Sequence, residues 1–226
     1  MYKVNCYFII SLFTITFVIL VQNGYNVFVT AEDNNSWWTM LANNLKEQGN
    51  YSGAIHLYDK ALFLEPNNIE IIANKGDTLN HMGNYSGAIS LYDNALRIDN
   101  NYKNALDGKG WALIELGNYT QALPYFDKAL QIDPNYKWSL SNKGWALIEL
   151  GNYTQALPYF DKALQIDPML VDALNFKGQT LNKLGNYTGA QYYIDKALQI
   201  DPKNLLLNKY LQNLALNKTS NPYVYI

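Results

Sequence analysis

The chain is poor in the residues that build metal sites and disulfides. Its 226 residues include one cysteine, Cys6, and two histidines, His56 and His81. A single cysteine cannot form an internal disulfide, and neither histidine has a Cys or His neighbour at the spacing that zinc sites use. The sequence therefore predicts no structural metal site, and it indicates no cofactor.

Charge is also sparse. Charged residues make up 16% of the chain and leave a formal net charge of −2. Such a chain has no basic field with which to neutralise phosphates, so we expect no nucleic acid partner. Hydrophobic residues, at 49%, are abundant enough to build a folded core.

An uncharged apolar run lies near the N-terminus. Residues 6–21, CYFIISLFTITFVILV, follow a short start whose only charge is Lys3. The run is shorter than the ~20 residues of a membrane-spanning helix and suits the core of a signal peptide, and Val29-Thr30-Ala31 offers small residues for cleavage. We expect residues 1–31 to form an apolar helix that is either a cleaved signal peptide or a retained membrane anchor. Either would leave the rest of the chain secreted, or anchored outside the cytoplasm.

A fixed period of 34 residues runs through the remainder of the chain. A Gly-Asn-Tyr triplet begins at Gly49, Gly83, Gly117, Gly151 and Gly185. In the same phase lie Ala54, Ala88, Ala122, Ala156 and Ala190, then Ala61, Ala95, Ala129, Ala163 and Ala197, then Pro66, Pro134, Pro168 and Pro202. Self-similarity at this period predicts stacked helix-turn-helix units.

Each repeated position has a mechanical role in such a unit. Helical spacing places Leu106, Gly110, Leu113 and Leu116 on one stripe of a first helix, and Ala122, Tyr125, Phe126, Ala129 and Leu130 on the facing stripe of a second. The turn glycine accepts positive φ, and the asparagine after it can cap the second helix. Small residues at Gly76, Gly110, Gly144 and Gly178 let the two helices approach closely. Pro124 and Pro158, inside second helices, should bend or loosen a turn.

These residues resemble the tetratricopeptide repeat (TPR) family, whose pattern has an early small residue, Gly and Tyr at the turn, spaced alanines and a final proline. The resemblance implies an all-α, TPR-type α-solenoid, with repeats in a right-handed superhelix whose first helices line the concave side. It places five repeats over residues 35–204, at 35–68, 69–102, 103–136, 137–170 and 171–204. Residues 205–216, with apolar residues on one face, suit a C-terminal capping helix, and residues 217–226 suit a loose tail.

Catalysis is not expected. Residues 109–134 and 143–168 are the same string, KGWALIELGNYTQALPYFDKALQIDP, so a catalytic group inside it would occur twice. No asymmetric cluster of nucleophile, base and charge stabiliser stands outside the repeats. We interpret the pairs Asp127-Lys128 and Asp161-Lys162 as solvated helix faces.

The resemblance also implies that partner contacts come from set positions of the first helices. In the middle of the array these carry Asp107, Trp111, Glu115, Trp138, Asn142, Trp145, Glu149, Asp172 and Phe176. Toward the N-terminal end they carry Asn43, Glu47, Glu70, Asn74, Asp77 and His81. One hypothesis is that Trp111 and Trp145 anchor an extended protein or peptide segment whose cationic residues meet Glu115 and Glu149. The alternative is that these tryptophans mainly pack against neighbouring first helices, and a glycan is a second possible ligand because sugars also stack on tryptophan.

The chain contains seven Asn-X-Ser/Thr triplets without proline. They begin at Asn34, Asn50, Asn84, Asn118, Asn152, Asn186 and Asn217. Five of them recur at the turn between helices, where asparagine also serves as a helix cap. An exported chain would present them to glycosylation machinery, so they are candidate glycosylation sites as well as caps.

Two functions remain open from the sequence. The first is a non-enzymatic scaffold, exported or membrane-tethered, that binds partner segments on its concave face. The second is a structural component of a cell-envelope or export assembly in which the groove has no ligand. A fold of this kind does not itself name a partner.

Overall fold

The computed structural model describes residues 5–11, 14–21, 25–29 and 34–202. The chain divides into two compact units, residues 1–98 and 99–226. The capping helix expected at 205–216 and the tail at 217–226 lie outside the described residues.

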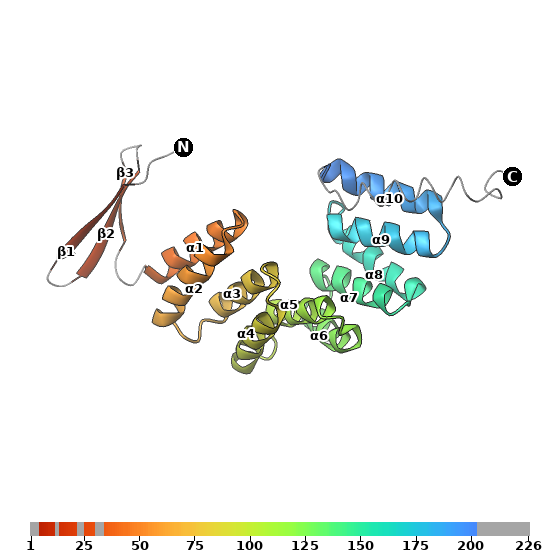
Figure 1. Cartoon of the computed structure of the whole chain (residues 1–226), viewed down its shortest axis with the longest axis horizontal. Helices are drawn as coiled ribbons and strands as arrows, with labels where there is room; N and C mark the ends of the chain where they lie inside the picture. The colour runs from red at the N-terminus through yellow and green to blue at the C-terminus, as the bar shows by residue number, and fades with distance from the viewer. Residues whose placement is uncertain (1–4, 12–13, 22–24, 30–33, 203–226) are drawn as a thin grey trace. The chain divides into compact units, whose positions relative to one another are not determined.

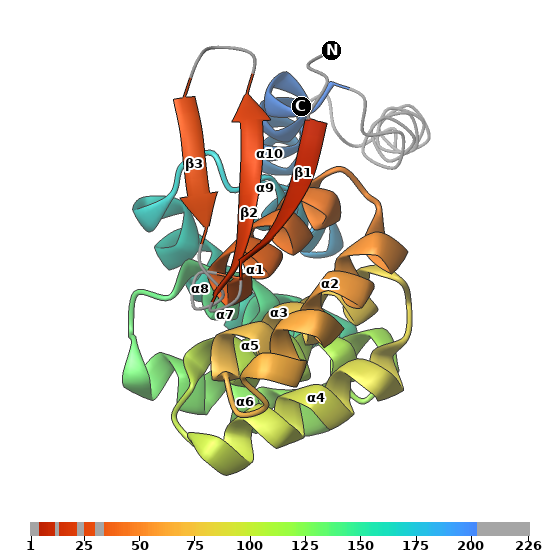
Figure 2. The same ribbon diagram turned by 90° about the vertical axis from the view of Figure 1, so that its left-hand side faces the viewer.

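The N-terminal segment forms strands in place of the expected apolar helix. The strands are β1 (Asn5–Ser11), β2 (Thr14–Val21) and β3 (Tyr25–Val29), and both neighbouring pairs are antiparallel. Figure 2 shows β2 between its two neighbours, as the strand order requires. A short apolar run does not distinguish helix from strand by periodicity, and this one is rich in β-branched and aromatic residues, which favour strands. Among the helices that the structure describes, none has the length and apolar character to cross a bilayer.

The first unit contains two helix pairs. They are α1 (Asn34–Glu47) with α2 (Tyr51–Leu64), and α3 (Ile69–His81) with α4 (Tyr85–Ile98). Within each pair the two helices pack side by side, joined by a tight turn (Figure 1).

The second unit contains three more pairs of the same kind. They are α5 (Lys103–Glu115) with α6 (Tyr119–Ile132), α7 (Lys137–Glu149) with α8 (Tyr153–Ile166), and α9 (Val171–Lys183) with α10 (Tyr187–Ile200). First helices of successive pairs touch, α5 against α7 and α7 against α9. The prediction of an all-α repeat fold is thus confirmed for residues 34–202.

Glycine ends every first helix in the way the sequence predicts. The five turn glycines have φ between 76° and 81°, and no other described residue has positive φ. At Gly117 the backbone N–H donates to the carbonyl of Ile114, and the N–H of Asn118 donates to that of Leu113, both at 2.8 Å. This pair of bonds satisfies carbonyls that the helix end leaves open and turns the chain into the second helix.

Close helix approach explains the glycine inside the first helices of the second to fifth hairpins. A Cβ at Gly144 would lie 2.6 Å from ring atoms of Phe160, and one at Gly110 would lie equally close to Phe126. The predicted stripes are buried at Leu106, Gly110 and Leu113, whereas Leu116, at the helix end, is 44% exposed. The helices α6 and α8 remain continuous through Pro124 and Pro158.

Candidate functional site

The first helices of the second unit are joined by a polar network at the predicted partner-binding positions. Asp107 on α5 accepts a hydrogen bond from Ser139 Oγ at 2.6 Å and from Asn142 Nδ2 at 3.2 Å, both on α7. Ser139 is completely buried. Asp107 and Asn142 therefore hold two repeats together, and their side chains are oriented by each other.

The aromatic residues at these positions are partly used in packing. The Trp145 ring stacks on Phe176 of the next first helix, with centroids 5.1 Å apart and planes 13° apart. The ring centroid of Phe176 also lies 6.1 Å from that of Phe160. Trp145 thus performs the packing role that was the alternative to an anchor, and, like Trp111, it is partly buried. Trp138 is 43% exposed, with the amine of Lys137 4.9 Å from its ring centroid.

Three carboxylates complete the predicted surface of the second unit. Glu115 and Glu149 lie exposed at the ends of α5 and α7, one repeat apart. Asp172 lies in the first turn of α9 and is exposed, yet desolvation by the protein around its carboxyl raises its pKa. These carboxylates give this part of the surface an acidic character.

A groove of about 580 Å³ lies in the first unit. Its walls are Ser36, Thr39, Met40, Asn43, Asn44, Glu47, Glu65, Asn68, Glu70 and Ile71. Three of these are carboxylates, Glu47, Glu65 and Glu70, and no lysine or arginine is among them. The mapping onto first-helix positions anticipated Asn43, Glu47 and Glu70. It missed Glu65 and Asn68, because they belong to the connection between repeats, which the first-helix positions do not include.

Buried tyrosines fix two polar residues of first helices, Asn43, which lines this groove, and Asp77. Tyr58 Oη on α2 donates to Asn43 Oδ1 at 2.5 Å, and Tyr92 Oη on α4 donates to Asp77 Oδ1 at 2.6 Å. Burial raises the pKa of Asp77, and the hydrogen bond from Tyr92 opposes that shift. In the third and fourth repeats the same two positions carry Phe and Trp, as in Phe126 with Trp111. The hydroxyl and its polar partner therefore occur together in the first two repeats, whereas the fifth repeat has Gln179 and Ile194 at these positions.

Lysines connect consecutive repeats through aspartates that remain about half exposed, a role that the sequence interpretation did not include. Asp127 and Asp161, interpreted above as solvated, pair with Lys143 and Lys177 of the following first helices. Lys143 also lies 4.5 Å from the ring centroid of Tyr159. Burial lowers the pKa of Lys143, but its bonds to Asp127 and Tyr159 outweigh that effect and raise the pKa overall. The signal was available in the sequence as a recurring Asp–Lys separation of 16 residues.

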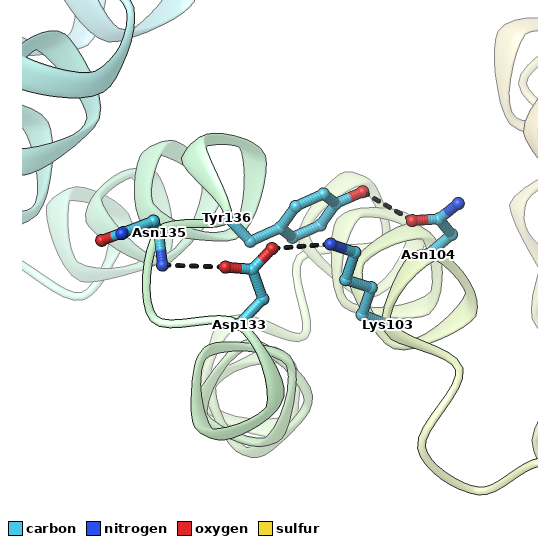
Figure 3. Close-up of polar contacts among 5 residues, drawn as sticks. All are labelled: Lys103, Asn104, Asp133, Asn135 and Tyr136. Atoms are coloured by element: carbon cyan, nitrogen blue, oxygen red, sulfur yellow. Dashed lines mark hydrogen bonds and ion pairs between the residues drawn. The ribbon is translucent and has the colours of Figure 1, made fainter.

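A second set of contacts closes the far end of a hairpin (Figure 3). Lys103, at the start of α5, pairs with Asp133, just after α6, at 2.6 Å. This bond and the N–H of Asn135 lower the pKa of Asp133. Tyr136 Oη donates to Asn104 Oδ1 at 3.0 Å, and Lys103 lies 4.8 Å from the Tyr136 ring centroid. The same kind of ion pair joins Lys137 to Asp167 at 2.7 Å, so this contact is part of the repeat framework.

The turn asparagines differ in what their side chains do. Asn50, Asn84 and Asn186 accept the N–H of the glycine three residues later, at 2.9 to 3.1 Å. Asn118 and Asn152 make no such bond, because glutamine replaces that glycine and a Cβ there would meet the capping side chain at about 2.9 Å, as at Gly53. All five are exposed. The cap prediction is thus confirmed at three turns and wrong at two. Asn217 lies outside the described residues.

Among the described residues, no group of three His, Cys, Asp or Glu side chains is arranged to hold a metal ion. The first helices present acidic and aromatic side chains on their exposed surfaces. Such surfaces bind other molecules by complementarity of shape and charge.

Comparison with known proteins agrees with this geometry. The chain is similar to a thermophilic TPR protein, TTC0263, of Thermus thermophilus, with 20% identity over 80% of this chain and 99% of that chain and a TM-score of 0.72. It is similar to the type IV pilus biogenesis factor PilW, with 24% identity, 81% and 86% coverage and a TM-score of 0.70. It is also similar to YrrB, described as a TPR protein with an unusual peptide-binding site, with 26% identity, 77% and 90% coverage and a TM-score of 0.55.

No curated protein sequence matches the chain significantly. Tetratricopeptide repeat profiles match residues 36–68, 68–135, 105–169 and 141–204. Over these ranges, which span all five hairpins, the chain belongs to the tetratricopeptide repeat family.

Proposed function

We propose that the chain is a non-enzymatic scaffold that binds an extended, cationic segment of a partner protein. The supporting observation is the groove of about 580 Å³ in the first unit, whose walls include Glu47, Glu65 and Glu70 and no basic residue. An acidic groove favours lysine- or arginine-bearing segments through electrostatic complementarity, which acts mainly on specificity and association rate. The peptide-binding description of YrrB concerns that protein and agrees with this class of ligand.

The groove is suited to an extended segment. Asn43, Asn44 and Asn68 supply amides that can bond a peptide backbone, and Met40, which is 62% exposed, supplies an adaptable apolar contact. Tyr58 holds Asn43 in place, so part of this surface is preorganised before a ligand arrives.

A peptide titration tests the proposal. Lysine- and arginine-containing nonapeptides are compared with versions in which glutamine replaces the basic residues, by isothermal titration with the purified chain. We expect binding only of the basic set, weakening as salt is raised, and weakened by Glu47→Gln with Glu70→Gln because rim charges act through the field they create. The matched control is Glu115→Gln with Glu149→Gln, which tests whether the second unit contributes. Equal binding of neutral and basic peptides would refute the cationic ligand.

We further propose that the chain is exported, and is either secreted or retained by its N-terminal segment. The support is the uncharged apolar run at residues 6–21 after Lys3. Determining the N-terminal residue of the mature protein separates a cleaved signal from a retained anchor. Intact mass before and after deglycosylation then tests the Asn-X-Ser/Thr sites, which export would expose to modification.

A further inference from the structure

A second hollow, of about 560 Å³, is lined by residues of α6, α7 and α8. Its walls include Leu130 and Pro134 from α6 and the loop after it, and Pro158, Tyr159 and Lys162 from α8. Leu140 and Lys143 of the first helix α7 also line it. None of the lining residues is one of the first-helix positions to which partner binding was assigned.

The hollow has a small side chain, Pro158, at a position where the last repeat has a large one. At the same position the other repeats have His56, Ser90, Pro124 and Tyr192. Tyr192 is 60% exposed and packs against Tyr193 with centroids 5.0 Å apart. A proline ring is smaller than a tyrosine side chain, so Pro158 leaves space where the last repeat places a phenol.

One cation is available at this hollow. Lys143, which also contributes to the walls, is paired with Asp127. Lys162 is half-buried and forms no ion pair within the described part of the chain. The hollow therefore combines proline, leucine and tyrosine walls with one lysine whose charge is not neutralised. An apolar side chain next to a carboxylate would complement it.

The first unit carries such a feature at the end of α2. Phe63 is 84% exposed, the highest value among the large hydrophobic residues of the described chain, and Leu64 beside it is 51% exposed. Glu65 follows directly. The other repeats place Arg97, Gln131, Gln165 and Gln199 at the position of Phe63, so packing of the repeats does not require an aromatic there. Phe63 and Leu64 are therefore an exposed apolar pair that the packing of the repeats does not require.

We propose that Phe63, Leu64 and Glu65 of one copy of the chain dock into the hollow at Pro158 of a second copy. Phe63 packs against Pro134, Pro158 and Tyr159, and the Glu65 carboxylate faces Lys162. The protrusion and the hollow are different patches, so the contact is heterologous and joins copies head to tail into rings or open chains that form as the concentration rises. The contact shares Glu65 with the peptide groove, whereas Phe63, its main anchor, is not among the residues that line that groove.

Sedimentation velocity of the full chain in mild detergent, over a range of concentrations, tests the proposal with variants that copy sibling repeats. Phe63→Gln reproduces the residue of three other repeats, Pro158→Tyr reproduces Tyr192 and fills the hollow, and Pro158→Ser reproduces Ser90 and leaves it open. We expect wild type and Pro158→Ser to associate, and Phe63→Gln and Pro158→Tyr to associate at least about tenfold more weakly, because a few buried anchors carry most of the energy of a contact. Circular dichroism verifies that each variant is folded.

A photo-crosslink locates the contact. Benzoylphenylalanine replaces Phe63 in a chain that is mixed with ¹⁵N-labelled chain, and crosslinked peptides are identified by mass spectrometry. We expect heavy–light crosslinks from position 63 to peptides within residues 127–162. A monomer at all concentrations, crosslinks to other regions or only within one chain, or equal loss of association in Pro158→Ser and Pro158→Tyr would each overturn the proposal.

Discussion

The packed glycine inside the first helices of repeats two to five gives a test in which the sign of the stability change decides. In an open helix, Gly→Ala stabilises by about 1 kcal/mol, because alanine loses less conformational freedom. At Gly144 the new Cβ would lie 2.6 Å from Cε1 and Cζ of Phe160, and that ring is completely buried and cannot turn away. Crowding of a packed core costs about 1–3 kcal/mol. We therefore expect Gly144→Ala to lower the free energy of unfolding by about 1 kcal/mol.

The matched control replaces Phe160 with a smaller side chain. Phe160→Leu destabilises on its own by creating space, but in that background the Cβ that Gly144→Ala introduces has room, so the same substitution should cost less or become favourable. The difference is a coupling energy, of about 0.5–3 kcal/mol for residues in contact. Urea unfolding followed by circular dichroism measures all four proteins. The first hairpin has Ala42 opposite Tyr58, which shows that a helix pair can be spaced for alanine. Stabilisation by Gly144→Ala with no coupling to Phe160 would refute the argument from close approach.

Two further outcomes follow from polar contacts. Asn50→Ala should lower the free energy of unfolding by about 1 kcal/mol because it removes a cap, whereas Asn118→Ala should change it little because Asn118 makes no cap bond; equal effects in urea unfolding would contradict this. Burial raises the pKa of Tyr58 to about 12, above its ordinary value of 10.0, so its contribution to stability is fully present below pH 10 and is lost as the pH rises toward 12. The urea midpoint of wild type should therefore fall more than that of Tyr58→Phe between pH 9.5 and 11.5, and parallel curves would exclude this role of Tyr58.

The sequence predicted which residues of the partner surface are exposed, but not the contacts that these residues make with one another. Residue type and phase were enough to place Glu115, Glu149 and Glu47 on exposed first-helix positions. They were not enough to show that Asp107 and Asn142 bond each other, or that Trp145 lies against Phe176. Those contacts join residues that are 31 to 35 positions apart, and they depend on the distance between neighbouring first helices, which a periodic pattern does not contain.

The sequence by itself determined the hairpins, because each one is specified locally. Positive φ at Gly117 requires glycine, and the small residue at Gly110 opposite Phe126 fixes which faces of the two helices meet. Identical local rules in every period give the same hairpin five times over residues 34–202. The N-terminal run lacks such rules, and it forms strands where a helix was expected.

Only the tertiary structure decided how the charges are used. Asp127 has the same sequence neighbours as Asp161 and would be solvated on an isolated helix, but stacking of the next repeat brings Lys143 to it. The connection carrying Glu65 and Asn68 becomes a wall of a groove for the same reason, since the following first helix packs beside it. These ion pairs and this groove are formed between neighbouring repeats, so they depend on the spacing of packed helices and not on the sequence of any single repeat.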